Sequence, residues 1–132
     1  MRIGIFSPSW PPGSDPNGIV TYVANLIPAL RKVGHEVFII TYDTFGDGRE
    51  AIDLRSFKRP LPMWHRALFK IAPETALFKA ASQPLVSAVR YLVARHGIEI
   101  FEMEETYGLS APISALNMIP VVVWLHGPWF IN

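Results

Sequence analysis

The first forty residues constrain the fold most, because they follow the order strand, proline-rich loop, helix, strand. The apolar run 2–7 has the composition of a buried strand. Residues 7–16 contain four prolines, which fix φ and lack a donor, so we expect neither helix nor inner strand there. Apolar residues recur at helical spacing over 19–33, and Gly34 stands where a left-handed residue ends a helix. With a second strand over 36–42, the segment predicts a right-handed βαβ unit, whose first loop lies at the carboxyl edge of the sheet.

The rest of the chain continues this alternation. Expected elements are an edge strand (51–57), a short helix (64–71), a further turn or two (74–79), a helix (82–95), a strand (98–103), a short helix (109–118) and a fully buried strand (119–125). Pro84 suits the first turn of the helix expected over 82–95, and Gly97 ends that helix.

About five strands alternating with helices predict an α/β fold, a Rossmann-like doubly wound parallel sheet with helices on both faces. We expect the strand order 3-2-1-4-5. That order brings the loops 8–18, 104–108 and 126–128 to one crevice at the switch point between the first and fourth strands.

Composition narrows the classes of function. The 132 residues make one domain or a piece of one, and half of them are hydrophobic, which suffices for a core. The excess of apolar residues indicates strands buried on both faces or a surface that meets something else. The net charge of +1 without a basic stripe gives no case for nucleic-acid binding, and the lack of cysteine removes thiol chemistry. With no signal peptide or apolar span, we expect a cytoplasmic protein.

The start of the first helix is a candidate phosphate site. A glycine there, Gly18, lets an anion approach the free N–H groups and the positive end of the helix dipole. The alternative is a plain helix entry with Asn17 as its N-cap. Neither dinucleotide-binding nor P-loop glycine motifs are present.

A histidine follows the last strand directly. His126 precedes Gly127 and Pro128, so we expect its imidazole to project from the carboxyl edge of the sheet, where it contacts a hydroxyl or a reacting centre. The alternative is a histidine that only caps the strand end. No group of His, Asp and Glu residues has metal-ligand spacing, so we expect no metal site.

Two carboxylates and an aromatic residue lie near the same crevice. Glu104 and Glu105 are adjacent and are expected to point apart; one could accept hydrogen bonds from a sugar hydroxyl or act as a base, and the alternative is solvated surface charge. Tyr107 and Gly108 either admit a ligand or only make the turn. Trp10 either stacks on a sugar face or anchors the proline loop.

An aromatic series over residues 64–78 has two interpretations. Trp64, Phe69 and Phe78 at helical spacing indicate a helix core. They also fit a hydrophobic or membrane-peripheral face with a basic rim. The rim would consist of Lys58, Arg59, Arg66 and Lys70.

The runs 1–12, 17–26 and 30–40, together with Val121–Gly127, resemble the N-terminal domain of retaining glycosyltransferases of family 4, also called group 1, which have the two-domain GT-B fold. By this resemblance Gly18, with Asn17 at the place of a second glycine, binds the donor diphosphate. His126 lies near the donor sugar, and 104–108 borders the acceptor pocket. The resemblance implies a nucleotide-diphosphate sugar as donor substrate, a carbohydrate or lipid-linked acceptor, and no cofactor.

The family's donor-binding C-terminal domain, with its basic pair and Glu-x7-Glu motif, is absent here. We therefore expect a truncated acceptor-side half over residues 1–132 that transfers no sugar alone. Apolar surface that the missing elements would cover should favour self-association. The competing hypothesis is a complete, non-catalytic flavodoxin-like module that binds a partner or a phosphorylated ligand.

Overall fold

The computed structural model describes residues 1–13, 17–44, 50–105 and 107–125. Strands and helices alternate along most of the chain, as the sequence predicts. They are β1 (Arg2–Trp10), α1 (Gly18–Lys32), β2 (Glu36–Thr44), β3 (Ala51–Asp53), the 3-10 helix η1 (Leu54–Phe57), α2 (Met63–Ile71), α3 (Pro73–His96), β4 (Ile100–Glu104), α4 (Ser110–Ser114) and β5 (Val121–Trp124).

One parallel sheet forms the centre of the molecule. Its strand order is β3-β2-β1-β4-β5, which confirms the predicted order. β1 pairs with β2 from Arg2↔Glu36 to Trp10↔Thr44, and with β4 over Ile3↔Ile100 to Ile5↔Glu102. The direction of winding reverses between β1 and β4, so the crevice expected for ligands lies where these two strands end.

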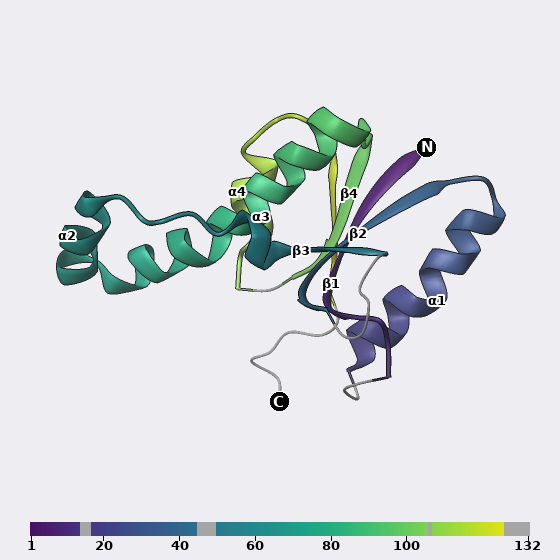
Figure 1. Ribbon diagram of the computed structural model, residues 1–132, viewed down its shortest axis with the longest axis horizontal. Coiled ribbons are helices and arrows are strands. Elements are labelled where there is room, and N and C mark those ends of the chain that lie inside the picture. Colours follow the sequence, from purple (N-terminus) through teal and green to yellow (C-terminus); the bar gives the residue numbers. More distant parts are fainter. Residues whose placement is uncertain (14–16, 45–49, 106, 126–132) are drawn as a thin grey trace.

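Helices cover the two faces of this sheet, with α1 on one side and α3 and α4 on the other (Figure 1). The first face contributes a core cluster that includes Ile5, Val23 and Ile39. The second contributes a larger cluster that includes Leu92 and Phe101. Successive side chains of a strand point to opposite faces of the sheet, so the strands contribute to both clusters. A parallel sheet with helices on both faces is the predicted Rossmann-like α/β architecture.

β1 extends further than expected, through Pro8 to Trp10. The predicted end of this strand at residue 7 was therefore wrong, although residues 7–10 are paired on one side alone and do not form an inner strand. The register pairs Ser7 with Thr41 and Ser9 with Asp43 and omits Pro8. Beyond Ile5, β1 pairs with β2 alone, so the missing donor of Pro8 breaks no ladder toward β4.

α3 is one helix of 24 residues, so the predicted break before Ser82 was wrong. Pro73 occupies the first turn, the place that we expected of Pro84, which lies inside the helix. Pro84 removes one backbone hydrogen bond, and the residues after it are held by burial against the sheet. Gly97 ends the helix, as predicted, and it adopts the left-handed conformation with φ of 61°.

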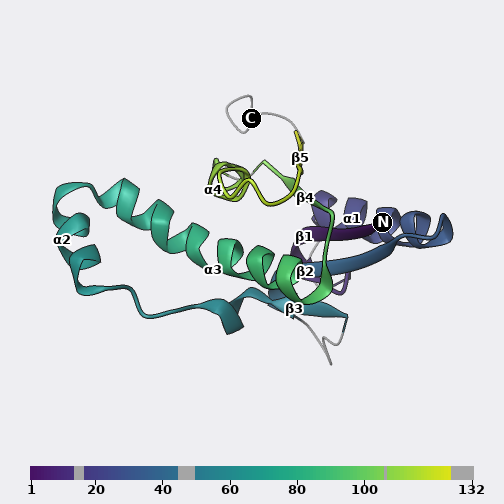
Figure 2. The same ribbon diagram turned by 90° about the horizontal axis from the view of Figure 1, so that it is seen from above.

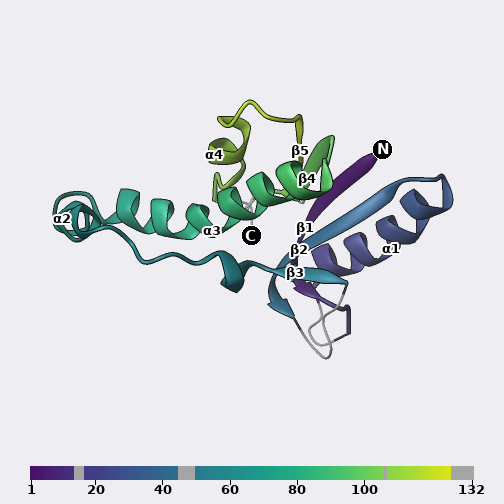
Figure 3. The same ribbon diagram turned by 45° about the horizontal axis from the view of Figure 1, so that its top comes forward.

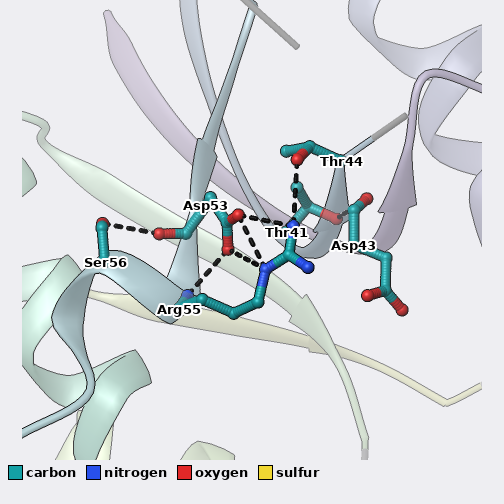
Figure 4. A network of polar contacts seen from close by, with 6 residues as sticks. All are labelled: Thr41, Asp43, Thr44, Asp53, Arg55 and Ser56. Carbon is teal, nitrogen blue, oxygen red and sulfur yellow. Dashed lines mark hydrogen bonds and ion pairs between the residues drawn. The ribbon is translucent and has the colours of Figure 1, made fainter. Parts of the chain in front are cut away.

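The third strand is shorter than the predicted 51–57, because the chain turns into η1 after Asp53. The Asp53 carboxylate caps η1 by accepting from the Arg55 N–H at 2.7 Å, and its Oδ2 lies 2.7 Å from Arg55 Nη2 (Figure 4). Arg55 Nη2 also donates to Thr44 Oγ1 on β2 at 3.2 Å. This network fixes the point where the chain leaves the sheet.

β5 is the last strand of the described sheet and pairs with β4 alone. The expectation of a fully buried strand was wrong, because Val122 and Trp124 are exposed. A β-branched run predicts the strand, but its burial depends on what lies beyond its free edge.

The chain then departs from the sheet in one region. We define the arm as residues 58–83, which comprise a proline-rich connection, α2 and the first half of α3. Figures 2 and 3 show α2 at the far end of α3, well beyond the strands. α3 is the element against which α2 packs. Among the described residues no helix is both long and apolar enough to cross a membrane.

Candidate functional site at the carboxyl edge of the sheet

The candidate site lies where α1 begins and where β4 and β5 end. α1 starts after the loop that follows β1, and β4 is the parallel neighbour of β1. Glu104 and Trp124, the last residues of β4 and β5, are paired across the sheet. The topology therefore brings these segments to one edge, as predicted. His126 and Gly127, the proposed catalytic and substrate-binding residues after β5, lie outside the described residues.

Asn17 caps α1, as one of the two alternatives predicts. Its side-chain oxygen accepts from the Ile19 N–H at 2.9 Å. Gly18, the first residue of the helix, is exposed, and a Cβ added to it would meet no atom within 4 Å. The backbone at the positive end of α1 is therefore open to a ligand, whereas Asn17 already has a structural role.

The two adjacent glutamates differ in their surroundings and point apart. Glu104 is only 9% exposed and lines a small, partly open pocket. Glu105 is exposed and holds the following loop: its Oε1 accepts from the Gly108 N–H at 2.9 Å and its Oε2 from the Ser110 hydroxyl at 3.2 Å. Glu105 thus orders the entry to α4.

Tyr107 and Gly108 form a tight turn after β4. Their φ values are 48° and 75°, so both residues adopt the left-handed conformation. The Tyr107 side chain is 80% exposed. Tyr107 and Gly108 therefore make the turn, and the Tyr107 ring is accessible to solvent beside the candidate site; the predicted contact with a ligand stays a prediction.

Trp10 is an anchor in this structure. Its side chain is 7% exposed and packs in the cluster between α1 and the sheet. The indole is therefore covered by the protein's own side chains, which corresponds to the anchoring alternative rather than to a surface that stacks on a sugar.

Three residues that were not predicted from the sequence complete the site. The Tyr22 hydroxyl of α1 donates to Glu102 Oε1 of β4 at 3.1 Å. The Tyr22 ring lies 5.1 Å from the Trp124 ring, centroid to centroid. Burial, followed by the charge and hydrogen bond of Glu102, raises the pKa of Tyr22 well above its usual value. Tyr22 thus remains protonated and donates to the carboxylate at neutral pH.

A cavity of about 10 Å³ lies inside this cluster, room for about one water molecule. It is lined by Ile5, Phe6, Ile19, Tyr22, Val23, Glu102, Met103, Glu104 and Trp124. Two glutamates and a tyrosine are therefore among the residues around a small, partly open and mainly apolar space next to the start of α1. Such groups bind hydroxyls well. Among the described residues there is no group of three side chains that could hold a metal ion.

Comparison with known proteins supplies the decisive observation. A family model described as Glycosyltransferase Family 4 matches residues 16–132, most of the chain. The chain belongs to glycosyltransferase family 4. The match spans α1, the whole edge described above and the described residues of β5. No curated protein and no solved structure gave a significant match.

The family identification agrees with the fold. Enzymes of this kind transfer sugars, and the Rossmann-like sheet of this chain is that of an N-terminal glycosyltransferase domain. Sugar substrates in general follow from the family. The competing flavodoxin-like module has no comparable support.

Proposed function

We propose that this chain is the acceptor-side domain of a retaining glycosyltransferase. The enzyme would move a hexose from a nucleotide-diphosphate sugar to a carbohydrate or lipid-linked acceptor, in the cytoplasm. A second, donor-binding domain completes the active centre in this proposal, and the chain alone transfers no sugar. His126 would act at the donor sugar, with Gly127 beside it.

The observation that carries the proposal is the open start of α1 beside a polar cluster. Gly18 leaves the first turn of α1 accessible, and a helix N-terminus attracts phosphate through its free N–H groups and its dipole. Tyr22, one turn further along the same helix, donates to Glu102 on β4. A diphosphate and a sugar hydroxyl would thus find suitable partners along one edge.

The acceptor would be held by the ends of β4 and β5. Carboxylates such as Glu104 accept hydrogen bonds from sugar hydroxyls. The partly exposed ring of Trp124, held by Tyr22, offers a face on which a sugar ring could stack. Trp124 takes over in this proposal the stacking role that was considered for Trp10.

The test of the phosphate site uses the chain itself. Titration with uridine diphosphate and with guanosine diphosphate should give weak binding, with a Kd of roughly millimolar size because the donor-binding domain is missing. Gly18→Val should weaken that binding about tenfold by filling the open space, a loss that corresponds to one or two hydrogen bonds. Ala29→Val, also exposed on α1, is the matched control and should leave the Kd unchanged.

Two outcomes would count against the proposal. Equal effects of both valine variants would show that the start of α1 does not hold the diphosphate. Sugar transfer by the chain alone, detected with a radiolabelled nucleotide sugar, would contradict the need for a second domain.

A further inference from the structure

The arm presents an apolar strip to solvent. Met63 and Ile71 on α2 are 85% and 83% exposed, and Ala67 between them is exposed as well. At spacings of four residues, these three lie along one side of the helix, with Trp64 next to them. Among the described side chains of α2 His65 is the buried one, so the helix packs partly through a polar ring and leaves Met63 and Ile71 uncovered.

The arm also concentrates positive charge. Residues 58–83 contain five lysines and arginines but only one acidic residue, Glu74, which gives a net charge of +4. The rest of the chain has seven basic and ten acidic residues, a net charge of −3. No acidic residue lies on α2. The overall charge of +1 therefore hides a strong asymmetry between the arm and the sheet.

A basic groove runs along the same arm. It has a volume of about 440 Å³ and lies between residues 59–62 and α3. Three cationic side chains line it, Arg59, Lys79 and Arg90, and none of its lining residues is acidic. The Lys79 ammonium also lies 5.5 Å from the centre of the Trp64 ring. Lys79 therefore connects the groove to the exposed aromatic residue of α2.

We propose that the arm docks on a membrane surface that carries anionic lipids. The strip of Met63, Trp64 and Ile71 would enter the boundary between head groups and acyl chains, while the basic residues bind lipid phosphates. An amphipathic helix with an apolar side and a cationic side binds membranes in this way without crossing them. The nine residues of α2 are too few to span a bilayer.

The charge distribution favours this occupant over a second copy of the chain. Two arms facing each other would bring together two regions of net charge +4. Anionic lipids instead neutralise the basic residues and attract them over about a Debye length. The inference stands apart from the proposed glycosyl transfer, because it uses none of the residues at the carboxyl edge.

Vesicle flotation tests the inference directly. The chain should bind vesicles of phosphatidylcholine with about one third phosphatidylglycerol at least tenfold more strongly than vesicles of phosphatidylcholine alone. Raising the ionic strength should weaken the binding, since exposed charges are screened. Failure to bind the anionic vesicles would overturn the inference.

Two double variants localise the contact. Met63→Ser with Ile71→Ser should reduce binding about tenfold by removing apolar side chains, and Lys70→Gln with Lys79→Gln should reduce it by a similar factor. The matched control is Val33→Ser with Lys32→Gln, which changes one exposed apolar and one exposed basic residue at the end of α1. It should bind within about twofold of the unchanged chain.

Two further outcomes would contradict docking of the arm on a membrane. Equal losses of vesicle binding in the control and the arm variants would show that binding depends on the charge of the whole chain and not on the arm. If the chain does not bind vesicles but forms an oligomer, and the double variant Met63→Ser with Ile71→Ser dissociates that oligomer, the strip is instead a contact with a second copy of the chain. Far-ultraviolet circular dichroism of each variant confirms that it is folded, and the charge variant gives an independent readout if the serine variant is not.

Discussion

The two halves of α3 show how differently one helix can be used. In its second half Leu85, Val89 and Leu92 are fully buried against the sheet. In its first half, within the arm, Leu77 is 58% exposed and Phe78 is also partly exposed. Figure 2 shows why: the sheet lies beneath only the later part of the helix. Apolar residues of similar type thus stabilise the fold in one half and remain available for contact in the other.

Burial determines which half of α3 stabilises the fold. A fully buried aliphatic side chain contributes roughly 1.5–3 kcal/mol through the removal of its surface from water. The exposed apolar residues of the arm contribute little of this stabilisation, because their surface stays in contact with water. We therefore expect the sheet with α1 and the second half of α3 to determine the free energy of unfolding, and the arm to contribute little.

The largest predicted effect is a direct test of that difference. Leu92→Ala should lower the free energy of unfolding by about 2–5 kcal/mol, because it removes a buried side chain and leaves a cavity. Leu77→Ala in the same helix should change it by less than about 0.5 kcal/mol, because the side chain is largely exposed. Urea unfolding followed by circular dichroism measures both. Similar losses for the two variants would show that the arm is part of the cooperative core.

The same contrast explains what could be predicted from the sequence. α1 was predictable because its signals are local: Asn17 caps its start and Gly34, with φ of 88°, follows its end. The break at Pro84 was predicted because proline favours first turns. Whether an interior proline is tolerated depends on packing against the sheet, which no local pattern shows. The exposed β5 likewise depends on its neighbours.

The candidate site was predictable only in part. Strand order follows from the alternation of elements, and it brings the start of α1 near the ends of β4 and β5. The Tyr22–Glu102 hydrogen bond joins residues eighty positions apart, so spacing gives no hint of it. Glu102 did offer a signal, since a charged residue in an alternating strand needs a partner. The predicted roles of His126 and Gly127 stay predictions.

The second prediction concerns the packing of the arm. His65 of α2 is buried, and its Nε2 has no hydrogen-bond partner in the described part of the chain. An unsatisfied buried polar atom costs roughly 1–3 kcal/mol. His65→Leu should therefore raise the stability of the arm by about 1 kcal/mol, seen as slower amide exchange in α2. The ring contact with Phe69, 5.2 Å between centroids, is lost and offsets part of the gain.

A matched variant gives this prediction its control. His65→Ala removes the unsatisfied nitrogen but also most of the side-chain volume, so a cavity should cancel the gain. Faster exchange in His65→Leu than in the unchanged chain would mean that the imidazole is a net stabilising group, and the arm would then resemble the sheet region more than we infer.

The smallest predicted effect lies at the junction of the two regions, where Asp53 ends β3 and the chain turns toward the arm (Figure 4). The hydrogen bonds and charge of Arg55 lower the pKa of Asp53 below its usual value. The unfolded chain therefore takes up a proton at a higher pH than the folded one. The resulting stability is present above the ordinary pKa and is lost as the pH falls through the lowered one.

Asp53→Asn isolates this contribution. The variant should melt slightly below the unchanged chain at neutral pH, by roughly 2 °C or less because the ion pair is partly exposed to solvent. The two melting curves should converge as the pH falls below the lowered pKa of Asp53. Ser56→Ala is the control: it removes a hydroxyl that donates to the Asp53 carbonyl at 2.7 Å but no titratable group, so its difference from the unchanged chain should not depend on pH. A difference for Asp53→Asn that stays constant with pH would mean that the carboxylate acts only as a neutral cap of η1, and the junction would then owe its geometry to the backbone rather than to charge.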